Sequence, residues 1–361
     1  MKRALSLLAL TVFVFALIST VFAPVAEARD APIRWRAVSH SLPGTYRHTT
    51  LERFGELIYR ASNGRMYVEV FGADMLFPVS DAFDHIANGV IEVGLIFSNF
   101  WVGRDPMFGV FSARPGSPLT RIEEGFFLEA QTFHIMERVY ARHGVTYLGT
   151  ISYSSPELLM MRTPIRTLED FQGMNIRASG LGGVFYSRLG ANVVNLPAGE
   201  IFIGLQTGVL DAAEWTEWRE NEEMGLLEVT TYAWYPALHG GVNEDKSLIV
   251  NPAAWNALPE DLQAIFLLAR DSIAWYSGWE NPTESRMAKL KWLENHPENM
   301  ITFSPEDEAA MREIANQIML DQKQHGPDAV EFIEIYARVA WELGHVERAE
   351  ALGFVPTEPR R

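Results

Sequence analysis

The sequence predicts an α/β protein of two lobes, in which mixed, mainly parallel sheets are flanked by helices and followed by a long helical C-terminal part. Strand and helix patterns alternate from Ile33 onward, and the segment Ala87–Gly94 is echoed by Gln206–Ala213. In addition, the 333 residues that follow an apparent leader of 28 exceed what a single hydrophobic core comfortably holds. Together these observations favour two lobes that meet at a hinge.

The first lobe is expected to contain three strands and two helices. Ile33–Val38 alternates apolar and polar residues, which is the period of a half-buried strand. Thr49–Ser62 places its apolar residues on one helical face. The pattern then predicts a strand over Met66–Phe71, a short helix over Asp81–Asn88 and a strand over Val90–Phe97.

The second half repeats this alternation and then becomes helical. We expect, in order, a helix at Leu119–Arg142, strands at Val145–Gly149 and Met174–Ala178, a helix at Gly183–Leu189, an extended segment at Asn192–Asn195 and a helix at Gly199–Thr207. Beyond Pro259 four helices are expected, at Glu260–Gly278, Pro282–Glu294, Pro305–Gln324 and Asp328–Leu343. Proline removes a helical hydrogen bond, so Pro282 predicts a new helix start.

The internal echo indicates how the lobes divide. Ala87–Gly94 and Gln206–Ala213 each read as the end of a short helix, a glycine and a strand with an acid at the same offset, although chance similarity is the alternative. We expect lobe I over 29–150 with a returning segment near 241–280. Lobe II is expected over 151–240 with C-terminal helices at 281–350, and a frayed tail over 351–361.

The N-terminus reads as an export signal. Lys2 and Arg3 precede an uncharged run that ends in an Ala-x-Ala sequence at Ala26–Ala28, which predicts a cleavable signal peptide over residues 1–28. An uncleaved membrane anchor is the alternative. The sequence has no cysteine, so the exported chain folds without disulfides and cannot be acylated as a lipoprotein. We therefore expect a free periplasmic protein.

Charge and motifs exclude several function classes. The formal net charge is −16, and −17 once the leader is removed, which disfavours binding to nucleic acid or anionic lipid. Hydrolase, phosphate-loop and helical zinc motifs are missing, and the nine histidines are dispersed. Ligand binding is therefore favoured over catalysis. A metal-dependent enzyme that uses Glu214 and Glu217 is a second, weaker hypothesis.

Three segments provide candidate binding residues. Met174–Ala178 reads as a strand with Arg177 near its carboxyl end, where a guanidinium can bind a carboxylate through two charge-assisted hydrogen bonds. The segment GVLDAAEWTEW, residues 208–218, delivers Glu214 and Trp215 to the end of another strand. Phe100 and Trp101 occupy the equivalent place in the first lobe. Ligands bind at this edge of open α/β sheets, although a surface ion pair and ordinary core packing are the alternatives.

The order of these motifs resembles the solute-binding proteins of tripartite ATP-independent periplasmic (TRAP) transporters, over nearly all of the chain after the leader. Gly64–Phe71 is similar to the family strand GR-x-x-V-E-V-F, and Thr163–Arg177 to its run P-I-x-x-x-x-D-L-x-G-x-K-I-R. Trp101–Pro106 and Ala213–Trp215 resemble the W-G-K-D-P and A-E-W segments of the branch that binds 2-oxo and 2-hydroxy acids. The resemblance implies a type II-like periplasmic binding protein fold.

The resemblance also implies roles for particular residues. Arg177 would clamp the ligand carboxylate, while Glu214 and the main-chain carbonyl of Trp215 would hold a Na⁺ or Ca²⁺ ion that touches the ligand. A further metal-binding acid is expected, for which the candidates are Glu244, Glu217 and Glu157. No other cofactor is expected.

The abundance of aromatic residues broadens the expected ligand class. Trp215 and Trp218, with Trp101, Phe100 and Tyr153, could stack an aromatic or larger acid, and Glu157 completes the expected binding set. The function expected from the resemblance is periplasmic capture of a 2-oxo, 2-hydroxy or aromatic carboxylate and its delivery to the small and large membrane subunits of a permease. The protein would act as a monomer or homodimer. A ligand-sensing role for a membrane receptor is an alternative.

Overall fold

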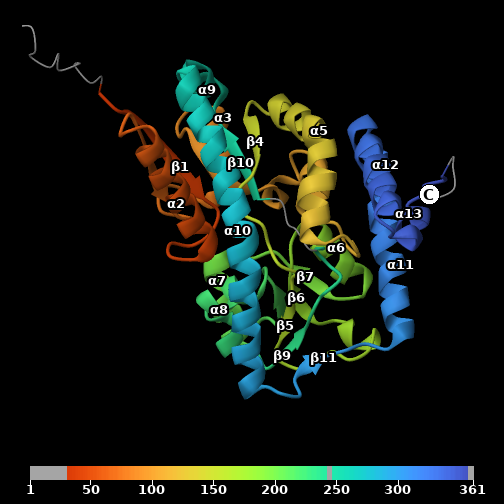
Figure 1. Ribbon diagram of the computed structural model, residues 1–361. Helices are drawn as coiled ribbons and strands as arrows, with labels where there is room; N and C mark the ends of the chain where they lie inside the picture. The colour runs from red at the N-terminus through yellow and green to blue at the C-terminus, as the bar shows by residue number, and fades with distance from the viewer. Residues whose placement is uncertain (1–30, 242–245, 357–361) are drawn as a thin grey trace, which may run out of the picture. The chain divides into compact units, whose positions relative to one another are not determined.

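Two mixed β-sheets, with helices packed on their faces, organise the chain (Figure 1). The computed structural model describes residues 31–241 and 246–356. The expected signal peptide, the candidate ligand Glu244 and residues 357–361 of the tail lie outside the described residues. From Arg34 onward the chain forms one compact unit. Among the described helices, none combines the length and apolar character needed to span a bilayer.

The first sheet has five strands, and its central members come from distant parts of the chain. Their order is β2 (Met66–Phe71), β1 (Ile33–Ser39), β3 (Val93–Phe97), β10 (Lys246–Val250) and β4 (Thr146–Thr150). β1 pairs with β3 in parallel, whereas β10 runs antiparallel to both β3 and β4. β3 begins at Val93 rather than Val90, because the N–H groups of Val90 and Ile91 donate back to the carbonyl of His85.

The second sheet has six shorter strands. Their order is β11 (Met300–Ile301), β9 (Tyr232–Trp234), β5 (Leu159–Met161), β8 (Ala212–Glu214), β6 (Asn175–Arg177) and β7 (Asn192–Val194). β8 and β7 pair with β6 in parallel, while β5 is antiparallel to β8 and β9. The expected mixture of strand directions is therefore present in both sheets.

The internal sequence echo corresponds to equivalent places in the two sheets. β3 and β8 each lie between a parallel neighbour and an antiparallel one. Each follows a short helix, α3 (Ala82–Ala87) or α7 (Ala198–Thr207), that ends near a glycine in the left-handed region. These glycines are Gly89, with φ of 70°, and Gly208, with φ of 81°. The repeated motif thus builds the same strand position twice.

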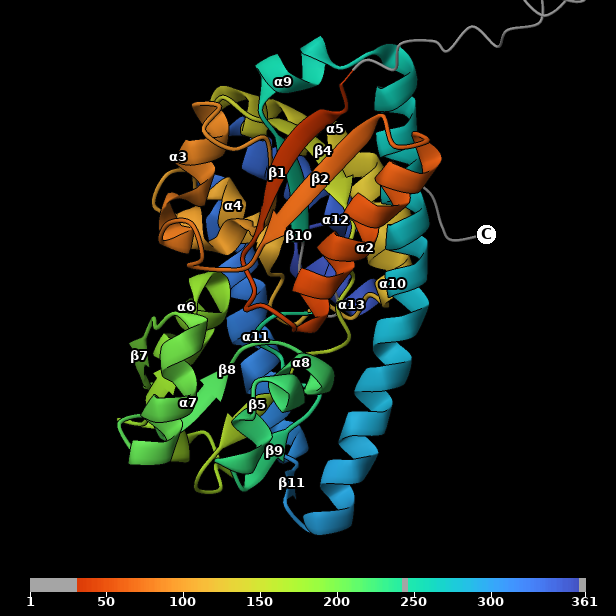
Figure 2. The ribbon, with the colours of Figure 1, turned by 90° about the vertical axis from the view of Figure 1, so that its left-hand side faces the viewer.

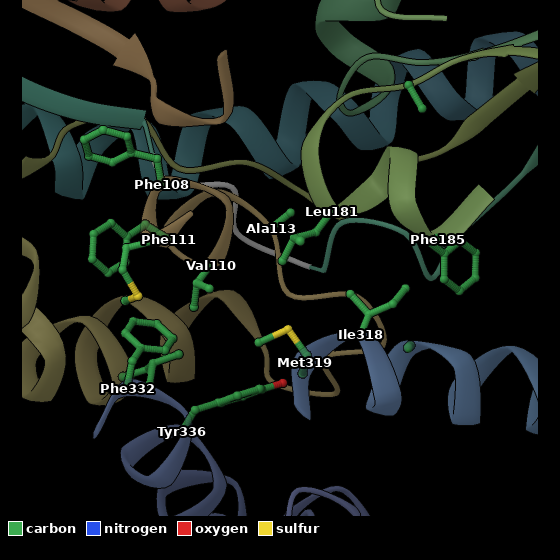
Figure 3. Packing of buried hydrophobic residues seen from close by; sticks show 14 of the residues in the cluster. Phe108, Val110, Phe111, Ala113, Leu181, Phe185, Ile318, Met319, Phe332 and Tyr336 are labelled. Atoms are coloured by element: carbon green, nitrogen blue, oxygen red, sulfur yellow. The ribbon is translucent and has the colours of Figure 1, made fainter. Parts of the chain in front are cut away.

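The remaining helices cover the sheets and build the main core. They are α2 (Tyr46–Ala61), α4 (Met107–Ser112), α5 (Glu129–Arg142), α6 (Gly180–Arg188), α8 (Trp218–Glu223), α9 (Pro252–Ala257), α10 (Glu260–Asn295), α11 (Pro305–Asp321), α12 (Pro327–Glu342) and α13 (Val346–Ala351). Figure 3 shows α4, α6, α11 and α12 contributing to one apolar cluster, in which Phe111 of α4 packs against Phe332 of α12. The C-terminal helices therefore brace the middle of the chain.

Helix α10 differs from the sequence expectation. Two helices separated near Pro282 are expected, but one helix of 36 residues runs through that proline, past elements of both sheets (Figure 2). An interior proline costs about 3 kcal/mol of helix stability, so packing must offset it. On the turns around Pro282, buried Ser277 donates to the carbonyl of Ile151 at 3.1 Å and buried Asn281 to that of Tyr153 at 3.0 Å. After the proline, buried Ser285 accepts from the N–H of Arg219 at 3.3 Å, so contacts on both sides of Pro282 hold the helix in line.

Candidate functional site

The expected clamp residue and the expected acid lie next to each other at the carboxyl ends of two paired strands. Arg177 ends β6 and Glu214 ends β8, and the two strands run in parallel with Arg177 opposite Ala213. Both side chains are almost fully buried. Parallel strands present their carboxyl ends at one edge, which explains why residues 37 positions apart meet there.

Arg177 is held by three acceptors and keeps one amino group unused. Its Nη1 donates to the main-chain oxygen of Glu214 at 2.7 Å and to Oε1 of Glu214 at 3.1 Å, and its Nε donates to the carbonyl of Leu196 at 3.1 Å. The guanidinium lies 4.8 Å from the ring centre of Trp215. Nη2 is buried and has no hydrogen-bond acceptor among the described residues. A buried donor of this kind favours an anionic ligand.

A small pocket and a larger cleft meet beside Arg177. The pocket has a volume of about 10 Å³ and is lined by His40, Arg47, Phe97, Arg177, Trp215, Thr216 and Glu220. The cleft, of about 330 Å³, shares His40 and Trp215 with it and is bounded by Phe100, by residues 73–74 and 78–80, and by residues 195–198. Because about 10 Å³ accommodates no more than one water, an organic ligand requires the pocket to widen toward the cleft.

A second group of ligating side chains adjoins Arg177. Glu157, Glu214 and His239 are all buried, and each offers one ligand atom within 4.8 Å of the others. His239 Nε2 lies 2.9 Å from Glu157 Oε2, and its Nδ1 lies 2.7 Å from the hydroxyl of Tyr186. Burial, with the nearby Glu214 and Glu157 carboxylates, raises the pKa of Tyr186 well above its usual value, so the hydroxyl stays neutral. Two carboxylates and an oriented imidazole form a suitable cation site.

A buried ion cluster connects the two sheets on the other side of the pocket. Arg47 of α2 donates to Glu217 Oε2 at 3.0 Å, to Ser154 at 2.8 Å and to Thr216 at 2.7 Å, and it also pairs with Glu220. Burial acts to raise the pKa of Glu217, but Arg47 and hydrogen bonding lower it below its usual value of 4.5. Glu217 is therefore ionised at neutral pH.

Buried acidic side chains outnumber buried basic ones around the pocket. Two arginines, Arg47 and Arg177, face four glutamates, which are Glu157, Glu214, Glu217 and Glu220. If all six side chains are ionised and the histidines are neutral, their charges sum to −2, and buried unbalanced charge is expensive. A bound cation would reduce the imbalance and would also offset the charge of an incoming carboxylate.

The structure does not bring every expected aromatic residue to this pocket. Phe100 lines the cleft and Trp215 lines both cavities. Trp101 instead packs against Phe83 in the core, and Trp218 is buried against Trp292 and Tyr235. Tyr153 lines a separate apolar pocket beside α10. For Trp101 and Trp218 the core alternative describes the observed surroundings, whereas Tyr153 lies at a pocket that does not include Arg177.

Several residues of the site escape sequence reasoning. His40 directly follows β1, and Arg47 lies in the first turn of α2. His239 lies in a loop after β9. Gly240 leaves room for the Glu157 carboxylate beside His239, because a Cβ at position 240 would lie 2.1 Å from Glu157 Oε2. Position 240 therefore needs a glycine so that the Glu157 carboxylate can approach His239. Arg47 carried no signal, since its helix reads as an ordinary amphipathic one.

Two mixed β-sheets flanked by helices, with a buried, charged pocket at the ends of their strands, are typical of two-lobe solute-binding proteins. The sequence profile of the DctP family, described as bacterial extracellular solute-binding protein, family 7, matches residues 38–325. The chain belongs to this family, which is that of the TRAP solute-binding proteins, as its motifs predict. It is therefore a binding protein and not an enzyme.

Individual relatives agree with this assignment. A monocarboxylate 2-oxoacid-binding periplasmic protein of Nostoc sp. is 30% identical over 243 residues, which is 66% of this chain and 65% of the relative. This chain therefore aligns with slightly less than two thirds of that relative. A TRAP periplasmic solute binding protein of Pseudoalteromonas atlantica, with sodium and pyruvate, matches with a TM-score of 0.78 and 20% identity. One of Colwellia psychrerythraea, with calcium and pyruvate, gives 0.79 and 19%. Each match covers 90% of this chain and all of the other, which shows the shared fold.

Proposed function

We propose that this protein captures a small organic acid in the periplasm and delivers it to a TRAP permease of small and large membrane subunits. The ligand is a 2-oxo, 2-hydroxy or aromatic carboxylate. The observation that carries the proposal is the buried Nη2 of Arg177, which has no acceptor among the described residues, in a guanidinium that lines the pocket beside Trp215. A carboxylate oxygen supplies the acceptor that this donor needs.

In this proposal a cation accompanies the ligand. Glu214, Glu157 and His239 hold it, with the main-chain carbonyl of Trp215 as a further oxygen ligand, and it offsets the excess of buried glutamates. Two relatives of the same fold bind pyruvate with sodium or with calcium. The oxygen donors suit Na⁺ or Ca²⁺, whereas the imidazole of His239 also suits a transition metal. Such an ion would supply positive charge that polarises and orients the ligand carboxylate.

Export and release complete the proposed cycle. Residues 1–28 direct the chain to the periplasm and are removed there. The part built on the first sheet and the part built on the second then close about the ligand by a hinge. A ligand shifts this equilibrium only if it binds the closed form better than the open one. A ligand in the pocket would contact Arg177 on one side and His40 and Phe97 on the other, and these contacts would favour the closed form.

Mass spectrometry of the ligand released from natively purified protein, with metal analysis of the same sample, tests the proposal. We expect a small carboxylate and about one equivalent of metal. Calorimetry with pyruvate, lactate and benzoate should then show that at least one acid binds, and that chelation of Ca²⁺ or omission of Na⁺ weakens this binding. Release of an uncharged ligand, with no binding of any acid in the presence of Na⁺ or Ca²⁺, would overturn the proposal.

Variants separate the cation from the carboxylate clamp. Glu157→Gln and Glu214→Gln should each lower the metal content and weaken acid binding, typically by 10- to 100-fold for a ligand-shell change. Glu331→Gln, which alters a surface ion pair with Arg138, is the matched control and should change neither quantity. Full acid affinity in metal-free protein would remove the cation from the proposal and leave the clamp.

A further inference from the structure

A second cavity lies beside α10, away from Arg177. Its volume is about 370 Å³, which is within the range of about 300–1,000 Å³ that ligand pockets usually occupy. None of its lining residues borders the two cavities beside Arg177. We call this cavity the α10 pocket, and it is lined by Arg121, Ile122, Gly125, Tyr153, Asp271, Ala274, Trp275, Gly278 and Trp279.

Aromatic rings form the walls of the α10 pocket. Trp275 and Trp279 lie one turn apart on α10, with ring centres 5.6 Å apart and an interplanar angle of 69°. Their exposed fractions are 59% and 55%, which leaves much of both indoles open to a ligand. Tyr153 provides a third ring, which is held against α10 because its backbone N–H donates to Ser277 and its carbonyl accepts from Asn281. Such walls favour a flat, aromatic ligand.

Two glycines make room for the side chains that line the pocket. Gly278 lies inside α10, and a Cβ there would be 2.5 Å from Nη1 of Arg121. Gly125 lies inside the π-helical segment Glu123–Leu128, and a Cβ there would be 3.0 Å from the ring of Tyr153. Glycine is unfavourable inside helices, and π-helical turns occur frequently at functional sites. The placement of both glycines at one cavity indicates a built site rather than a chance gap.

Arg121 is the cationic group of the pocket. It forms no ion pair among the described residues, and its guanidinium lies 5.9 Å from the ring centre of Trp279. Burial lowers the pKa of Arg121, and the groups that oppose this effect are tyrosines rather than carboxylates. Asp271, which also lines the pocket, instead pairs with Arg270, whose Nε donates to it at 2.9 Å. A half-buried cation without a counter-charge favours a carboxylate.

We propose that the α10 pocket binds a second small molecule, which is an aromatic monocarboxylate. Its carboxylate accepts from Arg121, and its ring packs between Tyr153 and the indoles of Trp275 and Trp279. This ligand is separate from the acid that Arg177 binds, because the two sites share no lining residue. An uncharged analogue lacks the charge-assisted pair with Arg121 and therefore binds more weakly.

Equilibrium dialysis with naphthylacetate, an aromatic monocarboxylate, tests the pocket directly. We expect the unaltered protein to bind naphthylacetate, and to bind the uncharged naphthylacetamide at least about tenfold less tightly. The amide has the same ring and nearly the same size, so the difference in affinity measures the charge pair with Arg121.

Two variants of the pocket should weaken this binding for different reasons. Arg121→Gln removes the positive charge and should lower the affinity for naphthylacetate by roughly 10- to 100-fold. Gly278→Ala displaces the Arg121 guanidinium with its methyl group and should also lower the affinity. Its melting temperature should stay the same or rise, because alanine favours a helix. Arg188→Gln, which alters a surface ion pair with Asp321, is the matched control and should bind normally.

Arg177→Lys separates the α10 pocket from the pocket beside Arg177. This variant weakens acid binding at position 177, and it should retain the binding of naphthylacetate that depends on Arg121. Loss of binding in Arg177→Lys together with full binding in Arg121→Gln would assign naphthylacetate to the pocket beside Arg177 and overturn the proposal. The proposal would equally fail if the unaltered protein did not bind naphthylacetate at millimolar concentration, if the amide bound as tightly, or if folded Arg121→Gln kept full affinity.

Discussion

At the scale of single residues, Arg177 combines a structural and a binding role. Its Nε and Nη1 hold the carbonyl of Leu196 and the backbone and carboxylate of Glu214, while Nη2 stays available for a ligand. The sequence suggests a guanidinium on an accessible strand end. The structure shows one that also compensates a buried glutamate, so its replacement affects folding as well as binding.

Replacement of Arg177 should therefore have two measurable effects. Arg177→Ala leaves the ligand carboxylate without its charged donor, and we expect a loss of about 2–5 kcal/mol of binding free energy. It also leaves Glu214 buried without a counter-charge and should lower the melting temperature. Arg177→Lys keeps the charge but not the planar fork, so it should retain more stability than affinity. Calorimetry and thermal melting measure the two quantities.

Arg188→Ala provides the control for this pair of variants. The Arg188 guanidinium pairs with Asp321 at the surface, and exposed pairs of this kind contribute about 0–1 kcal/mol. Neither ligand affinity nor melting temperature should change much. Acid affinity within about twofold of the unaltered protein in Arg177→Ala would contradict the clamp, whatever its melting temperature.

The sequence locates the charged residues of the candidate site better than the aromatic ones. Arg177 and Glu214 follow predicted strands, so topology alone brings them to one edge. Trp215 and Trp218 read alike, yet one lines the pocket and the other is 1% exposed against Trp292. An indole suits a core as well as a ligand pocket, and only three-dimensional packing separates the two. His239 depends on a loop contact with Glu157, which no local pattern encodes.

At the scale of elements, the clearest errors concern proline. Pro282 predicts a helix start, but tertiary contacts on both sides keep α10 continuous. Strand β5 went unpredicted because its three residues lie between Pro156 and Pro164, where local signals favour a loop. It forms because β8 and β9 pair with it on both sides. Longer periodic segments such as α2 and β2 were predictable, since their patterns are decided locally.

The glycine that follows α7, which the sequence echo repeats after α3, gives a stability prediction. Gly208 follows α7 with φ of 81°, and a Cβ there would lie 2.7 Å from Nη1 of Arg162. Gly208→Ala should destabilise the protein by about 1 kcal/mol or more. Gly199, in the first turn of the same helix, is exposed and has no atom within 4 Å of an added Cβ. Gly199→Ala should instead be neutral or stabilise by up to about 1 kcal/mol.

Chemical denaturation of both glycine variants measures this difference. The same substitution within one helix controls for changes in the unfolded chain. Equal effects of the two variants would show that the left-handed end of α7 does not limit stability.

At the scale of the whole molecule, the two sheets are joined by buried charge as well as by helices. Helix α10 packs against α2 and α8. Between α2 and the segment that begins α8, Arg47 pairs with Glu217 and Glu220 away from solvent. Any opening of the molecule at this contact exposes these groups to water. The protonation of Glu217 is therefore linked to the stability of the whole fold.

Acid should weaken the protein through this cluster. Burial acts to raise the pKa of Glu217, but Arg47, Thr216 and backbone hydrogen bonding lower it below 4.5 in the folded state. A lowered pKa means that the folded state binds fewer protons than the unfolded one. The stabilisation is therefore complete above about pH 4.5 and is lost as the pH falls through the folded pKa.

We expect Glu217→Gln to be less stable at pH 7 and to lose less stability on acidification. Denaturation midpoints at pH 7, 5, 4 and 3.5 measure both effects, with Glu331→Gln as an exposed control whose pKa is also lowered. Equal pH slopes for the two variants would refute a special role for the buried cluster, because the acid sensitivity would then come from surface carboxylates.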